Sequence, residues 1–290
     1  MRRLLLLVSI GLVAACTSSG SATTTTTTVA GAATSTTEVV TSTTTAATAD
    51  PGFRTRRRGV LTVATDRMVP PYVIERDGAA ASGLEYDIAA AVAAHLHVAV
   101  EFVHAPLVTL ATGYDCGCDL YLGQVPATEL LARSTDLSEP YLSADQVVLL
   151  RAGVTIADKP TAQALRWGTQ VRDDDGITWL HRTLVPTAPL DLYPDQTTLL
   201  DALHAGAVDA ALVDAPVALV AVQSDPTVQI AGRIATGGAY AAVLPLGSAN
   251  TSALNDIIRT LTRSGAIGLL ARLFLGAEPQ SIPVLDLSGS

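Results

Sequence analysis

Residues 59–66 read Gly-Val-Leu-Thr-Val-Ala-Thr-Asp, an apolar, β-branched run that ends in an acidic residue. The run predicts a buried strand, because β-branched side chains pack well on a pleated sheet. Residues 83–87 read Gly-Leu-Glu-Tyr-Asp and start a stretch in which apolar residues recur every fourth position, which predicts a helix. A strand followed by a helix is the repeating unit of a parallel sheet that is covered by helices.

The same alternation continues along the chain. Further strands are expected at residues 98–102, 118–122, 146–150, 166–170, 190–193, 208–213 and 239–244, and helices at residues 176–184, 197–205, from 216, 251–263 and 266–274. This order predicts an α/β fold with largely parallel sheets. Ligands bind such sheets beyond the carboxyl ends of the strands, so polar residues that directly follow strands are candidates for a binding site.

Four such residues stand out. Asp66 follows the first predicted strand, and two prolines then lead to Tyr72, whose ring can stack on a ligand. Glu85 lies at the start of a helix, where the helix dipole favours a carboxylate. Asp214 directly follows the predicted strand at residues 208–213. We expect these side chains to line a common site.

The first sixteen residues indicate export. Two arginines precede an apolar run of about ten residues, half of the roughly twenty that cross a bilayer, and such a run is typical of a signal-peptide core. The segment before Cys16 resembles a bacterial lipobox, which implies that residues 1–15 are a lipoprotein signal peptide and that Cys16 carries acyl chains such as palmitate. The alternative is an ordinary secretory signal with a chance cysteine. Two or more acyl chains anchor a protein stably.

Amino-acid composition indicates the character of the segment after the signal peptide and the class of partner. Residues 16–55 are mostly Thr, Ser and Ala without apolar periodicity, which predicts a disordered tether. A net charge of −9 argues against a nucleic-acid partner. No later apolar run reaches spanning length, so we expect a folded part at the extracytoplasmic face of the cell membrane, attached only through its lipid.

Six segments, in order, resemble the family 3 extracellular solute-binding proteins, the amino-acid-type receptors of ABC importers. They are residues 59–72, 83–89, 118–123, 135–141, 206–214 and 264–276. The resemblance implies a periplasmic-binding-protein-like type II fold, in which two α/β lobes are joined by a two-segment hinge and close on a ligand. It also implies ABC permease subunits as partners, a monomer, and no cofactor.

The resemblance places the hinge crossings near Leu150–Gly153 and Thr236–Ala241. Lobe one would then comprise residues 56–149 and 242–290, and lobe two residues 150–241.

The sequence departs from this family where its members bind an amino-acid carboxylate. The position of their arginine falls on Leu131, and the positions of the nearby hydroxyl donors become Gln124, Pro126 and Thr128. In the second lobe, three aspartates from Asp173 onwards take the place that an anion would occupy, although capping of a helix by Asp173 explains them equally well. An acidic cleft favours a small cationic or neutral polar solute over an amino acid in the usual pose.

The expected ligand-binding residues are Asp66, Tyr72, Glu85, Gly123, Gln124, Thr128, Asp173 and Asp214.

Cys116 and Cys118 flank one glycine in a chain that we expect in an oxidising compartment. A small disulfide is the favoured interpretation, and a soft-metal site or a reduced pair are the alternatives. We expect no metal.

No catalytic motif for a hydrolase, a nucleotide-binding enzyme or a zinc protease occurs, so we expect a protein that is not an enzyme. Two alternatives stay open. One is an enzyme on the same fold that resembles cyclohexadienyl dehydratases, although Leu131 offers it no carboxylate clamp. The other is an accessory binding protein of a periplasmic quinoprotein dehydrogenase.

Overall fold

The computed structural model describes residues 52–287. The expected signal peptide at residues 1–15, Cys16 and most of the tether at residues 16–55 lie outside these residues. Among the described helices, none is long and apolar enough to cross a membrane.

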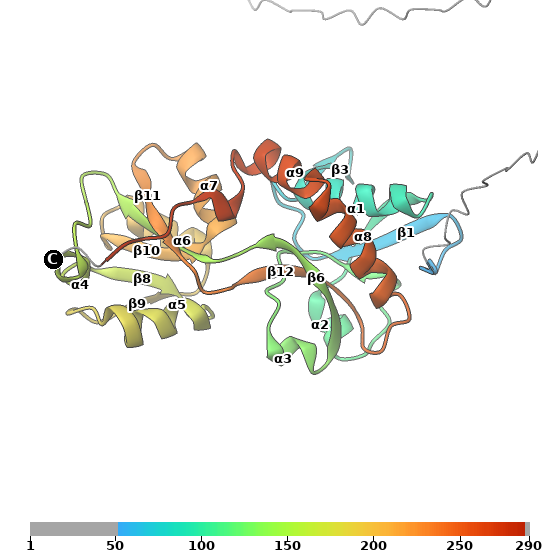
Figure 1. Cartoon of the computed structure of the whole chain (residues 1–290), viewed down its shortest axis with the longest axis horizontal. Coiled ribbons are helices and arrows are strands. Elements are labelled where there is room, and N and C mark those ends of the chain that lie inside the picture. The colour runs from blue at the N-terminus through green and yellow to red at the C-terminus, as the bar shows by residue number, and fades with distance from the viewer. Residues whose placement is uncertain (1–51, 288–290) are drawn as a thin grey trace, which may run out of the picture. The chain divides into compact units, whose positions relative to one another are not determined.

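Two α/β lobes, each built on a five-stranded sheet, make up the described chain (Figure 1). The sheet of lobe one has the order β4 (Ala99–His104), β1 (Val60–Thr65), β5 (Leu120–Tyr121), β12 (Ala239–Pro245) and β6 (Thr135–Ser143). The sheet of lobe two has the order β11 (Val228–Ile234), β7 (Gln146–Arg151), β10 (Ala210–Asp214), β8 (Trp167–Gln170) and β9 (Asp191–Tyr193). A small hairpin, β2 (Ile74–Arg76) and β3 (Ala79–Ser82), is attached to lobe one.

Each sheet combines parallel strands with antiparallel connecting strands. In lobe one, β1 pairs in parallel with β4 and β5, and in lobe two, β8 pairs in parallel with β9 and β10. The strands on either side of the hinge, β6, β7, β11 and β12, pair antiparallel with their neighbours. The predicted α/β architecture is therefore present.

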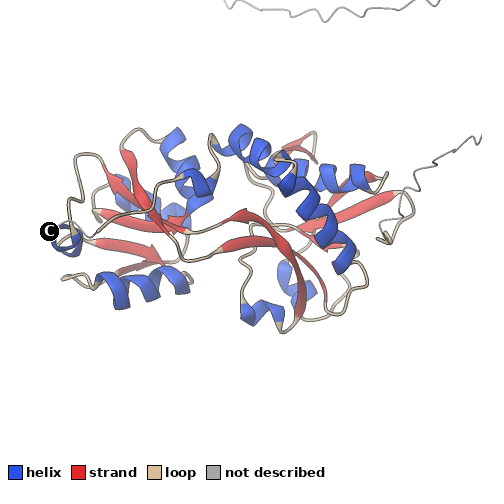
Figure 2. Cartoon of the chain, viewed as in Figure 1, coloured by secondary structure: helices blue, strands red, loops and turns tan. Residues whose placement is uncertain are grey.

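Helices cover the sheets of both lobes (Figure 2). Lobe one carries α1 (Leu84–His95), α2 (Leu107–Ala111), α3 (Glu129–Ala132), α8 (Thr251–Arg263) and α9 (Ala266–Leu275). Lobe two carries α4 (Lys159–Gln163), α5 (Asp174–Trp179) with a π-helical turn at Leu180–Leu184, α6 (Gln196–His204) and α7 (Ala215–Ser224). The period predicted for α1 is real, because Leu84, Ile88 and Val92 are buried.

The first hinge crossing lies earlier than the sequence predicted. β6 ends at Ser143 in the sheet of lobe one, and β7 starts at Gln146 in the sheet of lobe two, so the chain crosses at residues 144–145 and not near Leu150–Gly153. The second crossing, at residues 235–238, overlaps the expected range Thr236–Ala241. The reason is that the apolar run at residues 147–150 is buried throughout. Its sequence pattern would be the same in the sheet of either lobe, so the pattern does not show on which side of the crossing the strand lies.

The C-terminal segment returns to lobe two, whereas the sequence assigned it to lobe one. We call residues 279–287 the C-terminal strap. Its backbone pairs with β11, because Arg233 N donates to Pro283 O and Leu285 N donates to Arg233 O, both at 2.8 Å. Gly232 permits this approach, since a Cβ atom there would lie 2.8 Å from the Cα atom of Leu285. The strap is a third connection between the lobes (Figure 1).

Hydrogen bonds of Asp145 link the two hinge crossings and the strap. Its Oδ1 atom accepts a hydrogen bond from Gly237 N in the second crossing at 2.7 Å, and its Oδ2 atom accepts one from Arg233 Nη1 at 2.5 Å. Arg233 Nε also donates to Ile282 O in the strap at 3.2 Å. One buried carboxylate thus links both crossings and, through Arg233, the strap.

Candidate functional site

The start of α1 brings two predicted residues together. Gly83 has a φ of 122°, and a Cβ atom there would lie 2.3 Å from Tyr72 O, so only glycine allows this approach. Glu85 N donates to Tyr72 O at 3.0 Å. The loop that follows β1 is therefore held against the helix, and Tyr72 is buried there.

Glu85 is a fully buried carboxylate. It accepts hydrogen bonds from Tyr141 Oη at 2.5 Å and from Gln124 N at 2.7 Å, and Gln124 Nε2 lies at 3.5 Å. Burial raises the pKa of Glu85, and these hydrogen bonds act in the opposite direction. Glu85 thereby fixes the backbone of Gln124, which follows β5 with a positive φ of 53°.

Asp214 ends β10 and joins the two lobes. Its Oδ1 atom accepts from Gln146 Nε2 of lobe two at 2.8 Å, and its Oδ2 atom accepts from Tyr240 Oη of lobe one at 2.6 Å. Burial raises the pKa of Asp214 to about 6, and the charges of Asp173 and Asp175 also act to raise it. The acidic start of α5 therefore influences the titration of Asp214.

Two buried polar atoms beside these carboxylates have no hydrogen-bond partner among the described residues. They are Tyr72 Oη and Gln146 Oε1, on side chains that are 6 % and 4 % exposed. The charges of Glu85 and Asp214 raise the pKa of Tyr72, after the larger effect of its burial. Unpartnered buried polar atoms are rare in native proteins and require an explanation.

We call these six residues the hinge cluster: Tyr72, Glu85, Tyr141, Gln146, Asp214 and Tyr240. The sequence predicted three of them, Tyr72 and Asp214 from their position after strands and Glu85 from its position at the start of a helix. It missed Tyr141, Gln146 and Tyr240, which lie within or at the start of the strands beside the hinge. Gln146 directly precedes the apolar run at residues 147–150, and an amide at the start of a buried strand was the available signal.

Asp66 lies beside β5 rather than in the hinge cluster. Tyr121 Oη donates to Asp66 Oδ1 at 2.5 Å, and Asp66 is exposed. Gly123 allows the Tyr121 ring to pack closely, because a Cβ atom there would lie 2.8 Å from the ring. Asp66 and Gly123 therefore both contact or accommodate Tyr121, in the middle strand of the sheet of lobe one.

Two other predicted ligand residues have roles as helix caps. Thr128 Oγ1 accepts from Leu131 N at 3.3 Å and caps α3. Asp173 Oδ1 accepts from Gly176 N at 2.9 Å and caps α5, and Asp173 Oδ2 accepts from Thr169 Oγ1 at 2.6 Å. Capping is the alternative that the sequence offered for Asp173, and the structure shows it.

The position of the family arginine carries no cation. Leu131 packs against a small apolar cluster beside β5, and Arg133 is exposed. Cys116 and Cys118 form a disulfide in the structure. Within residues 52–287 there is no group of three or more His, Cys, Asp or Glu side chains that could hold a metal ion.

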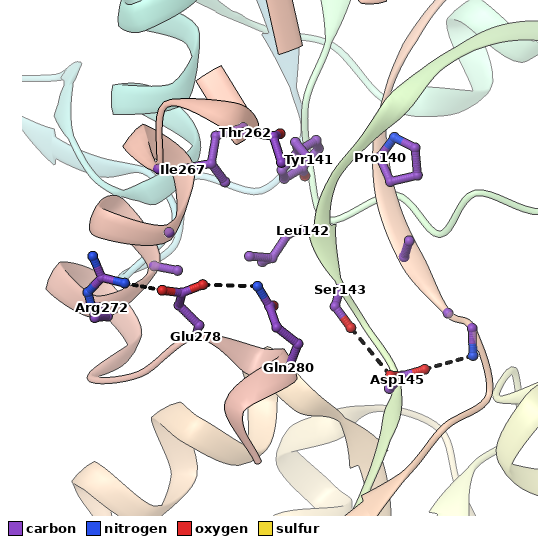
Figure 3. A pocket seen from close by; sticks show the side chains of 16 residues that line it. Pro140, Tyr141, Leu142, Ser143, Asp145, Thr262, Ile267, Arg272, Glu278 and Gln280 are labelled. Carbon is purple, nitrogen blue, oxygen red and sulfur yellow. Dashed lines mark hydrogen bonds and ion pairs between the residues drawn. The ribbon is translucent and has the colours of Figure 1, made fainter. Parts of the chain in front are cut away.

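A cavity of about 420 Å³ lies beside the hinge, between both crossings, α9 and the strap (Figure 3). Its charged side chains are already paired: Arg272 with Glu278, which also accepts from Gln280, and Asp145 with Arg233. The cavity therefore presents fewer unsatisfied groups to a ligand than the hinge cluster does.

Comparisons with known proteins match most of the described chain to solute-binding proteins. The family model of the bacterial extracellular solute-binding proteins, family 3, matches residues 61–277. The L-cystine-binding protein TcyJ of Escherichia coli (strain K12) is 24% identical over 239 residues, which cover 79% of this chain and 88% of that protein.

The fold is shared with solved structures, among them two solute-binding proteins. An ancestral cationic amino acid solute-binding protein, AncCDT-1, has a TM-score of 0.61 and 20% identity, over 75% of this chain and 96% of that chain. The amino acid ABC transporter substrate-binding protein AbpA of Streptococcus pneumoniae, bound to L-arginine, has a TM-score of 0.59 and 22% identity, over 75% and 95%. The predicted two-lobe, type II fold is confirmed.

Proposed function

The chain belongs to the bacterial extracellular solute-binding proteins of family 3, and on that premise we propose that it captures a small polar solute, cationic or neutral, for an ABC importer. The solute would bind between the lobes at the hinge cluster, with Asp66, Gly123, Gln124, Thr128 and Asp173 nearby. ABC permease subunits would receive it at the extracytoplasmic face of the membrane.

The observation that carries this proposal is the position of Asp214. Its carboxylate lies between the lobes, yet its hydrogen-bond partners, Gln146 and Tyr240, are both neutral. Asp214 is partly buried, and removing a carboxylate from water costs free energy unless a cation pairs with it. A cationic solute would supply that pairing. It would also favour closure of the two lobes, because it would contact Asp214, which is hydrogen-bonded to residues of both lobes.

The relatives support this choice of solute. One solved relative is bound to L-arginine, and another is a cationic amino acid solute-binding protein. The chain differs from carboxylate-binding members of the family at Leu131, so we propose that the cationic part of the solute provides most of the recognition.

Binding is tested by thermal unfolding with a panel of amines, guanidines, basic amino acids and neutral polar solutes. A solute that binds only the folded protein stabilises it by about 2.7 kcal/mol at one hundred times its dissociation constant. We expect the melting temperature to rise with cationic members of the panel. A panel that leaves it unchanged throughout contradicts the proposal.

We also propose that Cys16 is lipidated and that residues 16–55 tether the lobes to the membrane. Fractionation of cells tests the anchor. The unchanged protein should remain with the membrane fraction, whereas Cys16→Ala should be released. A Cys16→Ala variant that still partitions with membranes contradicts lipid anchoring.

We propose binding rather than catalysis, although a second structure of the ancestral relative AncCDT-1 is described as that of a precursor of cyclohexadienyl dehydratase. Leu131 stands at the position of the arginine with which carboxylate-binding members of the family hold their ligand. Incubation with prephenate and arogenate should therefore give no turnover, and measurable elimination would support the enzyme instead.

A further inference from the structure

We infer that Gln146 is a specificity-determining residue whose Oε1 atom accepts a hydrogen bond from an N–H group of the solute, beside Asp214. The solute class is then an organic cation with several N–H donors, such as a guanidinium or a primary ammonium. This inference rests on the proposed function and extends it to a residue at the hinge.

The orientation of the Gln146 amide is determined by its neighbour. Gln146 Nε2 lies 2.8 Å from Asp214 Oδ1, and only the NH₂ end of the amide can donate to a carboxylate. A flipped amide would place two acceptor oxygens in contact. Gln146 Oε1 therefore points away from Asp214, and it is buried without a partner.

Two other hydroxyl donors of the hinge cluster are already used. Tyr240 Oη donates to Asp214, and Tyr141 Oη donates to Glu85. What remains is the amide oxygen of Gln146, the unpartnered hydroxyl of Tyr72 and the free lone pairs of the two carboxylates. The cluster is rich in acceptors and poor in donors, so a complementary solute must bring the donors.

The chemistry of the donors follows from these acceptors. A guanidinium carries five N–H donors and an alkylammonium three, together with a positive charge that suits Asp214. A quaternary ammonium carries the charge but has no N–H group, so it leaves Gln146 Oε1 unsatisfied. The site should therefore distinguish cations by their hydrogen-bond donors as well as by charge.

The position of Gln146 connects recognition to the hinge. It directly follows Asp145, whose carboxylate is bonded to Gly237 N and Arg233 Nη1. A donor that bonds to Gln146 thus binds directly beside the first crossing, next to Asp214 of lobe two. Solute contact at this point links both lobes.

The test uses calorimetric titration of the purified protein with two probes. Agmatine carries a guanidinium and a primary ammonium, and choline carries a quaternary ammonium. We expect agmatine to bind at least about tenfold more tightly than choline, because a missing N–H donor leaves buried acceptors unpaired. Equal affinities overturn the inference.

Variants assign the effect to residues. Gln146→Met keeps the length of the side chain and removes both polar atoms, and it should weaken agmatine binding by about tenfold or more. Gln229→Met, on an exposed position of β11, is the matched control and should leave the affinity unchanged. Wild-type affinity in Gln146→Met overturns the inference.

Tyr72→Phe provides a second test if Gln146→Met fails to fold. It removes a hydroxyl that has no protein partner, so the melting temperature without solute should not fall, while the affinity for agmatine should. A loss of stability with unchanged affinity contradicts the assigned role. If agmatine fails to bind while a neutral solute still raises the melting temperature, the inference fails and the proposed capture function stands.

Discussion

Tyr240 Oη in lobe one donates a hydrogen bond of 2.6 Å to Asp214 Oδ2 in lobe two. The two residues lie in different sheets and are separated by 26 positions in the sequence. This contact holds the lobes together beside the hinge without a charged donor, and it leaves the negative charge of Asp214 unbalanced.

Tyr240→Phe should reduce the free energy of unfolding by about 1–3 kcal/mol at neutral pH, because the partly buried carboxylate of Asp214 loses a hydrogen-bond donor. Urea denaturation measures this change. Tyr86→Phe is the control: its ring stacks on Phe102 with centroids 5.4 Å apart, and the substitution keeps that stacking. Equal stability of the two variants would contradict a structural role of the Tyr240 hydroxyl.

Asp214 should make stability and binding respond to pH in opposite ways. Its pKa is raised from 3.8 to about 6, so between these values the folded protein binds more protons than the unfolded one, and stability falls as pH rises. Asp214→Asn should therefore stabilise the solute-free protein at pH 7 by roughly 1–3 kcal/mol, and this gain should shrink toward pH 4.

Binding of a cation should weaken as the pH falls through about 6, because protonation removes the charge of Asp214. Titration at several pH values tests this, and Asp214→Asn should bind weakly at all of them. If the affinity of the unchanged protein is constant from pH 7 to pH 5, Asp214 does not bind the cation.

Gly232→Ala should displace the C-terminal strap. The new Cβ atom would lie 2.8 Å from the Cα atom of Leu285, so the strap must move away from β11. We expect a loss of about 1–3 kcal/mol in stability, as for other overpacked sites, and faster hydrogen exchange at the Leu285 amide. Exposed Gln229→Ala on the same strand should leave that exchange unchanged, and unchanged exchange in Gly232→Ala would show that the strap tolerates the methyl group.

Thiol titration should show that Cys116 and Cys118 are oxidised. Because Cys118 is 1% exposed, the assay is made in denaturant, on a Cys16→Ser variant in which no other cysteine remains. No thiol should react before reduction and two should react after it. Two reactive thiols without reductant would identify a reduced pair.

The sequence predicted the local elements well, because the apolar period of α1 and the β-branched run of β1 are visible without tertiary information. It placed the first crossing wrongly, since the buried run of β7 has the same pattern in either sheet. The strap was also missed: its pairing with Arg233 is a contact between segments 49 or more residues apart, which no local pattern encodes.

The site was predicted in part for similar reasons. Asp214, Glu85 and Tyr72 follow strands or start a helix, and topology alone brings such residues together. Thr128 and Asp173 also occupy those positions, but their side chains cap helices. Gln146 and Tyr240 lie in strands on opposite sides of the hinge, and only the folded arrangement shows that both meet Asp214.

The strap gives the two ends of the described chain different attachments. Arg54 N donates to Asn250 Oδ1 near α8 of lobe one, whereas Leu287 packs against the apolar cluster of lobe two. A fluorophore near Thr55 and another near Leu287 would each follow one lobe. Energy transfer between them would then report opening and closing directly, so the protein could serve as a sensor for its own solute.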